Sequence, residues 1–159
     1  MRKNAGFTLI ELMVVIAITG ILSAIVVPNM IDWRNNAKFN GCVLNMRGGL
    51  EMAKLRAIKE NAKVAVIFDV VDNGYAIFVD NGAGANANNW THDEDEQLLR
   101  NIQLPAGITL STTRSNNRLR FNSRGRCIGI TITSANTNGK KMDVIVSIVG
   151  RIRISSIYE

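Results

Sequence analysis

Residues 6–18 read Gly6-Phe7-Thr8-Leu9-Ile10-Glu11-Leu12-Met13-Val14-Val15-Ile16-Ala17-Ile18 and place one carboxylate inside an otherwise unbroken apolar segment. From Leu12 to Ile31, twenty consecutive residues carry no formal charge, which is enough for a helix to cross a bilayer. A charge at the centre of such a segment costs about 2.5–3.5 kcal/mol on insertion scales, and less nearer its edge. Glu11 is therefore expected to have a specific role.

The segment before the apolar run is short and basic, with Arg2 and Lys3 ahead of Gly6. No Ala-x-Ala cleavage site follows the apolar run, as it would in an ordinary secretory signal. Residues 6–28 closely resemble the type IV prepilin signature, and Pro28 falls at the helix-bending proline of that family.

The resemblance implies that a prepilin peptidase and N-methyltransferase cuts after Gly6 and methylates the new N-terminal Phe7. Glu11 would then pair with the free amino terminus of a neighbouring subunit in a filament, since a buried carboxylate is tolerable only beside a compensating charge. The alternative is a plain signal anchor with Glu11 at the lipid headgroups.

Charge is spread unevenly along the chain, whose formal net charge is +6. Residues 111–159 hold nine basic and two acidic residues, a net +7, and this asymmetry suggests an anionic partner there. Arg2 and Lys3 predict an N-terminus on the cytoplasmic side of a bacterial inner membrane and a C-terminal domain in the periplasm. The expected organisation is a leader over 1–6, a membrane-spanning or filament-core segment over 7–31, and one periplasmic domain over 32–159.

Hydrophobic periodicity predicts a single helix over residues 7–60, with Pro28 as a kink. Its second half has one apolar stripe, made of Phe39, Val43, Met46, Leu50, Ala53 and Ala57. From residue 63 the period changes to two, which predicts strands. They are expected over 63–69, 75–80, 108–112, 118–122, 128–134, 143–149 and 151–155, with a turn at 72–74 and a long polar loop over 81–97. The predicted fold class is α+β and pilin-like, with one long helix packed on an antiparallel β-sheet domain.

Four later blocks, residues 53–61, 78–80, 120–125 and 146–153, resemble the FimT/GspH family of minor pilins and pseudopilins. GspH-like members belong to the pseudopilus of the type II secretion system. FimT-like members belong to type IV pili, and some bind DNA for natural transformation. The resemblance implies other pilins or pseudopilins, an assembly platform and the inner membrane as partners, and a position at or near the filament tip. It favours the secretion branch and the pilus branch about equally.

The ending Gly150-Arg151-Ile152-Arg153 resembles the Gly-Arg-x-Arg motif that the FimT-like branch uses to capture double-stranded DNA. On a strand, two arginines separated by one residue project from the same face and can each bind a phosphate oxygen. The candidate DNA-binding residues are Arg151, Arg153, Arg118, Arg120, Arg124, Arg126, Lys140 and Lys141. The alternative is a charged edge strand that resists aggregation. No aromatic residue interleaves with the arginines in the sequence, which argues against a surface for stacking single strands.

The other reactive residues give weaker signals. Cys42 and Cys127 are open to two interpretations, a disulfide in an exported domain or two small buried side chains. His92 lies beside four acids, but their spacing does not match a calcium loop, so no metal site is predicted. Trp90 is expected to cover the sheet. No catalytic constellation or cofactor motif is present in the sequence, so we expect a structural protein rather than an enzyme.

Overall fold

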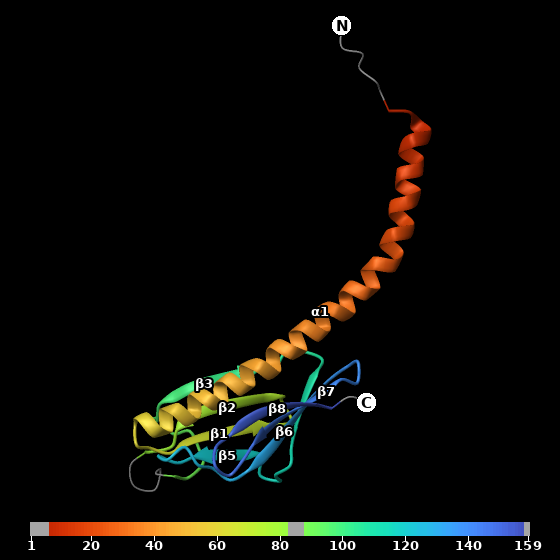
Figure 1. Cartoon of the computed structure of the whole chain (residues 1–159). Coiled ribbons are helices and arrows are strands. Elements are labelled where there is room, and N and C mark those ends of the chain that lie inside the picture. The colour runs from red at the N-terminus through yellow and green to blue at the C-terminus, as the bar shows by residue number, and fades with distance from the viewer. Residues whose placement is uncertain (1–6, 83–87, 158–159) are drawn as a thin grey trace. The chain divides into compact units, whose positions relative to one another are not determined.

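The computed structural model describes residues 7–82 and 88–157 of the chain. Within these residues it contains one helix and eight strands (Figure 1). The chain divides into two compact units, Met1–Ala37 and Lys38–Glu159, which we call the helical unit and the globular unit. The helix contributes to both.

Helix α1 spans Leu9–Lys59, so the predicted helix over residues 7–60 is confirmed to within two residues at each end. Thr8 caps its start, because the backbone N–H of Glu11 donates a hydrogen bond to Thr8 Oγ1 at 3.3 Å. Asn61 follows its end in the left-handed conformation, with φ of 50°, which is a common way to terminate a helix.

In the helical unit, polar side chains bond back to the helix itself. Thr19, Ser23 and Asn29 donate to the carbonyl oxygens four residues earlier, at 2.8, 2.7 and 3.2 Å. Pro28 lies inside the helix and has no N–H to donate. The two hydroxyl groups and the Asn29 amide thus bond to the backbone of the helix itself.

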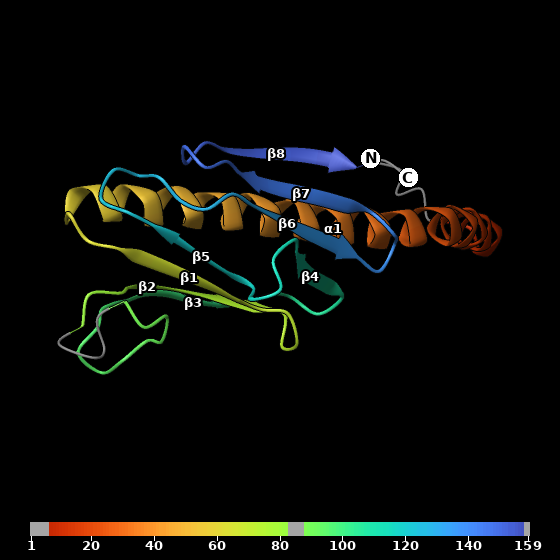
Figure 2. The ribbon, with the colours of Figure 1, turned by 90° about the horizontal axis from the view of Figure 1, so that it is seen from below.

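The globular unit contains two four-stranded sheets in which every paired neighbour is antiparallel (Figure 2). Sheet A has the strand order β3-β2-β1-β5, and sheet B has the order β4-β6-β7-β8. The strands are β1 Val64–Asp69, β2 Gly74–Val79, β3 Leu98–Gln103, β4 Ile108–Thr112, β5 Arg118–Phe121, β6 Ile130–Asn136, β7 Lys141–Val146 and β8 Ile152–Ile157. The predicted α+β class is confirmed.

The core forms where the second half of α1 meets the sheets. All six predicted stripe residues are fully buried: Phe39, Val43, Met46, Leu50, Ala53 and Ala57. Gly49 lies on the same face, where an added Cβ would sit 3.3 Å from Ile77 Cδ1 and 3.4 Å from the Tyr75 hydroxyl of β2. The helix therefore lies close against sheet A at this glycine.

The β1–β2 hairpin is confirmed. Its turn includes Asn73 with φ of 52°, and the Asp69 carboxylate accepts hydrogen bonds from the N–H groups of Val71 and Asp72 at 3.0 and 2.9 Å. These are the contacts that Asp and Asn make in tight turns.

Strand β3 was not predicted. Its sequence, Leu98-Leu99-Arg100-Asn101-Ile102-Gln103, has no clear alternation and contains one β-branched residue. It is an edge strand with no fully buried side chain, and its pairing with β2 shifts register between Ile77 and Phe78. Burial therefore did not impose a period-two pattern on it.

The ends of sheet B also differ from prediction. β6 begins at Ile130 rather than at 128, and β7 ends at Val146 rather than at 149. A turn over residues 147–150 follows, in which Gly150 has φ of 74° and donates its N–H to the Ser147 carbonyl at 2.8 Å. β8 begins at Ile152, so Arg151 directly precedes the strand instead of beginning it as predicted, and its carbonyl accepts from the Ser147 N–H at 3.0 Å.

Candidate functional site

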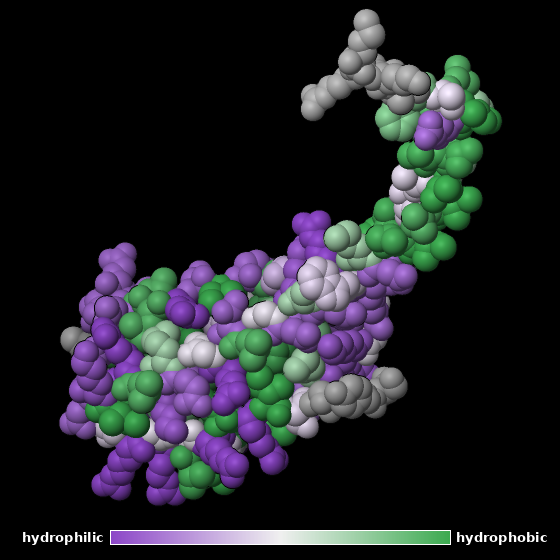
Figure 3. Space-filling view, turned by 45° about the horizontal axis from the view of Figure 1, so that its top comes forward, coloured by the Kyte–Doolittle hydropathy of each residue, from purple (hydrophilic) through white to green (hydrophobic). Residues whose placement is uncertain are grey.

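The first candidate site is the apolar half of α1 with its single carboxylate. Every side chain described from Phe7 to Arg34 is exposed, and Figure 3 shows this half of the helix as an almost continuous apolar surface. By length and composition it could cross a membrane. Glu11, in its first turn, is exposed within this surface. Gly6, the other predicted processing residue, lies outside the described residues.

The second candidate site is the set of eight basic residues expected to contact DNA. The structure places them in three regions of the globular unit rather than on one surface. Arg118 and Arg120 lie on β5 beneath the 88–97 loop; Arg124, Arg126, Arg151 and Arg153 lie near two touching turns or on β8; Lys140 and Lys141 lie at the start of β7.

Trp90 covers the two arginines of β5. The guanidinium carbons of Arg118 and Arg120 lie 4.6 and 3.7 Å from its ring centroid, within the range of a cation–π interaction. The expected role of Trp90 as a cover over the sheet is confirmed. No aromatic residue interleaves with the arginines in the sequence, but Trp90 reaches Arg118 and Arg120 from a distant loop.

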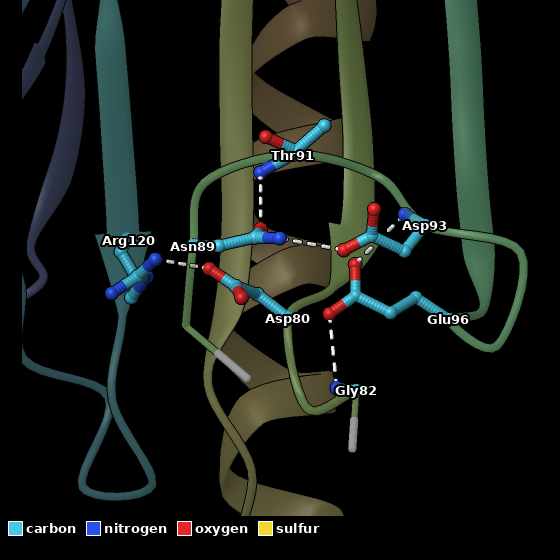
Figure 4. A network of polar contacts seen from close by, with 7 residues as sticks. All are labelled: Asp80, Gly82, Asn89, Thr91, Asp93, Glu96 and Arg120. Atoms are coloured by element: carbon cyan, nitrogen blue, oxygen red, sulfur yellow. Dashed lines mark hydrogen bonds and ion pairs between the residues drawn. The ribbon is translucent and has the colours of Figure 1, made fainter. Parts of the chain in front are cut away.

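Arg120 is also paired. It forms an ion pair with Asp80, whose side chain is fully buried (Figure 4). A buried carboxylate needs such a partner. Arg120 therefore serves the folded structure, and only part of its charge is available to a ligand.

Hydrogen bonds within the 88–97 loop hold it closed (Figure 4). The Glu96 carboxylate accepts from the N–H groups of Gly82 and Asp93 at 3.0 and 3.3 Å, and Asn89 Nδ2 donates to Asp93 Oδ2 at 2.6 Å. The His92 ring packs edge-on against Phe78 at 5.5 Å between centroids. Among the described residues, no three His, Cys, Asp or Glu side chains converge as metal ligands.

Two turns bring three of the remaining arginines together. Asn122 Oδ1 accepts hydrogen bonds from the N–H groups of Arg124 and Arg126, both at 3.0 Å, and so closes the first turn. At Gly150 of the second turn, an added Cβ would lie 1.9 Å from the Gly125 carbonyl oxygen. The turns are in direct contact, so Arg124, Arg126 and Arg151 gather at one end of the globular unit, and all three are exposed.

Lys140 lies elsewhere. Its Nζ donates to Asn40 Oδ1 at 3.0 Å, whereas the touching turns lie beside Lys54. Fourteen residues of helix separate these two positions, or about 21 Å at 1.5 Å per residue. Lys140 and Lys141 are thus too far away to extend the cluster at the turns.

The two cysteines are free thiols. Cys42 lies on α1 in a groove with Tyr75 and Ile102, whereas Cys127 Sγ donates to the Ser147 carbonyl at 3.2 Å. Burial raises the pKa of both thiols, and for Cys127 a backbone hydrogen bond from Gly150 and the charge of Lys54 oppose it. Cys127 is near Lys54, twelve helical residues or about 18 Å from Cys42, beyond the reach of a disulfide.

Sequence reasoning missed Asp80 and the stacking role of Trp90. Asp80 directly follows β2, where a polar residue normally begins a loop. Asp80 meets Arg120 only when β5 pairs with β1, and Trp90 meets the two arginines only when the 88–97 loop returns across β5. No local pattern encodes that return.

Two family models match the chain. The prokaryotic N-terminal methylation motif matches residues 1–27, and the type II transport protein GspH model matches residues 44–150.

Curated relatives match about a third of the chain. The type IV major pilin protein PilA of Myxococcus xanthus is 49% identical over 45 residues, which are 28% of this chain and 20% of PilA. The type II secretion system core protein G of Klebsiella pneumoniae is 41% identical over 58 residues, 35% of this chain and 41% of that protein. The chain thus matches less than half the length of these relatives.

Solved structures share the fold at low identity. The minor pseudopilin EpsH from the type 2 secretion system of Vibrio cholerae has a TM-score of 0.57 and 15% identity, covering 75% of this chain and 97% of EpsH. The type IV minor pilin FimU of Pseudomonas aeruginosa has a TM-score of 0.59 and 16% identity, covering 77% and 92%. Since the GspH model spans residues 44–150, more than half of the chain and most of the globular unit, this chain belongs to the family of type II transport protein GspH.

Proposed function

We propose that this chain is a non-enzymatic minor subunit of a type IV filament machine, either a type II secretion pseudopilus or a type IV pilus. The observation that carries the proposal is the first half of α1, which exposes a long apolar surface with one carboxylate. Contiguous apolar surface of this extent marks a membrane or protein contact. We assign the helix to the inner membrane before assembly and to the packed helices of a filament afterwards.

The methylation motif over residues 1–27 supports processing between Gly6 and Phe7 by a prepilin peptidase that also methylates Phe7. Arg2 and Lys3 favour a cytoplasmic N-terminus and place the globular unit in the periplasm. An assembly platform would then move the subunit from the membrane into the filament, at or near its tip.

Glu11 is proposed to set the position of the subunit during assembly. Once the helix is surrounded by other apolar helices, its carboxylate needs a cation. Cleavage before Phe7 creates a free amino group, and the amino group of a neighbouring subunit would supply that cation.

Substitution of Glu11 tests this role in a bacterium that assembles its own filament. Glu11→Ala should insert and be processed normally. The amount of this variant in sheared or cross-linked filaments should fall about tenfold, because the loss of a charge pair worth about 1.4 kcal/mol corresponds to that factor. Met13→Ala, also on the exposed apolar helix, is the matched control. Unchanged incorporation of Glu11→Ala would refute the pairing.

Gly6→Ala separates processing from assembly. This variant should remain an uncleaved precursor on an immunoblot. A product of normal, shortened length would contradict cleavage at this site.

DNA uptake is a second candidate function, favoured by the gathering of Arg124, Arg126 and Arg151 on the two touching turns, with Arg153 exposed nearby in sequence on β8. Contacts of exposed arginines to phosphates do not depend on DNA sequence and weaken strongly with salt. On this proposal, duplex DNA binds at that end of the globular unit.

A salt series of duplex DNA binding by the full chain in lipid nanodiscs tests the second function. Arg151→Ala/Arg153→Ala should reduce the slope of log affinity against log salt by about 2, since each phosphate contact contributes about 0.9. Lys140→Ala/Lys141→Ala removes the same charge at the other end of β7 and should keep more of the binding. If the wild-type chain does not bind duplex DNA even at low salt, the DNA-uptake function is contradicted and the secretion pseudopilus is favoured.

A further inference from the structure

A surface pocket lies in the globular unit between the loop that carries Trp90 and the ends of the two sheets. It is lined by Lys63, Trp90, Arg120, Asn122, Arg126, Cys127, Ile128 and Ile148. We call it the distal pocket. One of its lining residues, Arg126, belongs to the arginine cluster at the two turns, but the lining also includes apolar side chains.

Two isoleucines that line the distal pocket are exposed. Ile128 is 54% exposed and Ile148 is 62% exposed, and the adjoining Val149 is 67% exposed. A hydrogen bond from the Cys127 N–H to the Ile148 carbonyl, at 3.1 Å, holds the two segments together where they leave sheet B. Isolated exposed apolar residues are common, but a group of them around a pocket marks an interaction surface.

The rim of the distal pocket is positively charged. Lys63 and Arg126 are both exposed, and no Asp or Glu is among the lining residues. Arg120 contributes little net charge, because it is paired with Asp80. Arg124 and Arg151 on the touching turns extend the positive field around the same end. The pocket thus offers two isoleucines flanked by cations.

We infer that the distal pocket binds an extended acidic segment of a partner protein. One large apolar side chain of that segment lies between Ile128 and Ile148, and its carboxylates face Lys63 and Arg126. This inference rests on the proposed assembly role for the expectation that the globular unit meets other protein chains. Charge complementarity favours an acidic partner. The exposed isoleucines favour a protein segment over nucleic acid, because an apolar side chain can pack against them whereas a phosphate cannot.

The test uses the full chain in lipid nanodiscs and a fluorescein-labelled peptide of six glutamates around one leucine, read by anisotropy. A second peptide replaces the leucine with serine, and a labelled DNA duplex tests the nucleic-acid alternative. The protein variants are Ile128→Ser/Ile148→Ser and Lys63→Gln/Arg126→Gln. Their matched controls are Val71→Ser, an exposed valine in the β1–β2 turn, and Arg34→Gln/Arg47→Gln, two exposed arginines of α1.

The leucine peptide should bind the wild-type chain roughly tenfold more tightly than the serine peptide, as burial of one leucine predicts. Ile128→Ser/Ile148→Ser should abolish that preference, Lys63→Gln/Arg126→Gln should weaken both peptides, and both controls should behave as wild type. Equal binding of the two peptides would overturn the inference. So would DNA binding that needs Lys63 and Arg126 but not the isoleucines. Neither result bears on Glu11 or on processing, so failure of this inference can be distinguished from failure of the proposed role as a filament subunit.

Discussion

Gly150 lies where the turn before β8 touches the turn before β6. Its φ is 74°, and a Cβ there would lie 1.9 Å from the Gly125 carbonyl oxygen. Gly150→Ala should therefore destabilise the globular unit by about 3 kcal/mol, which combines left-handed strain with steric overlap. Urea unfolding of residues 38–159, which contain the whole buried core, measures this loss.

Gly139 provides the matched control for that prediction. Its φ is 81°, but nothing lies within 4 Å of an added Cβ. Gly139→Ala should cost only the left-handed strain, about 1–2 kcal/mol. Equal losses for the two variants would mean that the contact between the turns contributes nothing to stability.

The 88–97 loop is the element whose placement depends most on one side chain. Trp90 stacks on Arg118 and Arg120, and such cation–π interactions contribute about 0.5–2 kcal/mol. Trp90→Ala should therefore speed hydrogen exchange of the Gly82 and Asp93 amides, which donate to Glu96, by about two- to thirtyfold. Hydrogen-exchange mass spectrometry measures this.

Amides within β6 and β7 supply the internal reference for the Trp90→Ala measurement, because these strands belong to sheet B, whereas the two arginines under Trp90 lie on β5 of sheet A. They should exchange at wild-type rates. Unchanged exchange at Gly82 and Asp93 would show that the loop closes without the tryptophan.

Elements with a strong repeating pattern could be predicted from the sequence, and elements held by distant contacts could not. The α1 stripe and the β1–β2 hairpin follow from periodicity and turn residues, since both are set by neighbours in the chain. β3 was not predicted because an edge strand with no fully buried side chain need not alternate apolar and polar residues. Glu11 stood out as a charge in an apolar run, whereas the pairing of Arg120 with Asp80 exists only after β5 joins β1.

At the scale of the whole molecule, the two units differ in what they bury. The buried apolar residues run from Phe39 to Ile152, all within the globular unit, while the described side chains from Phe7 to Arg34 are all exposed. The globular unit thus carries its own stability, and the helical unit depends on what surrounds it.

The stability of the globular unit should fall at alkaline pH. Burial raises the pKa of the Cys42 and Cys127 thiols above 9.0 and that of the Tyr75 hydroxyl above 10.0. Well below pH 9 these groups are neutral in both states and have no effect. As the pH approaches and passes the unfolded pKa values, the unfolded chain loses its protons first, which favours unfolding. Urea titrations of residues 38–159 from pH 7 to pH 11 measure this decline, and a free energy of unfolding that rises over this range would contradict it.

Each unit also contains one of the two tryptophans, Trp33 in the helical unit and Trp90 in the globular unit. The molecule therefore has a separate optical reporter for each half. Trp33→Phe leaves an intrinsic fluorescence signal that follows closure of the loop over Arg118 and Arg120. Trp90→Phe leaves a signal from the Trp33 indole, which is 70% exposed and lies just after the predicted membrane segment 7–31. We expect its emission to shift to shorter wavelength if neighbouring subunits bury this part of the helix on insertion into a filament. Insertion and loop opening can thus be timed independently, without any attached dye.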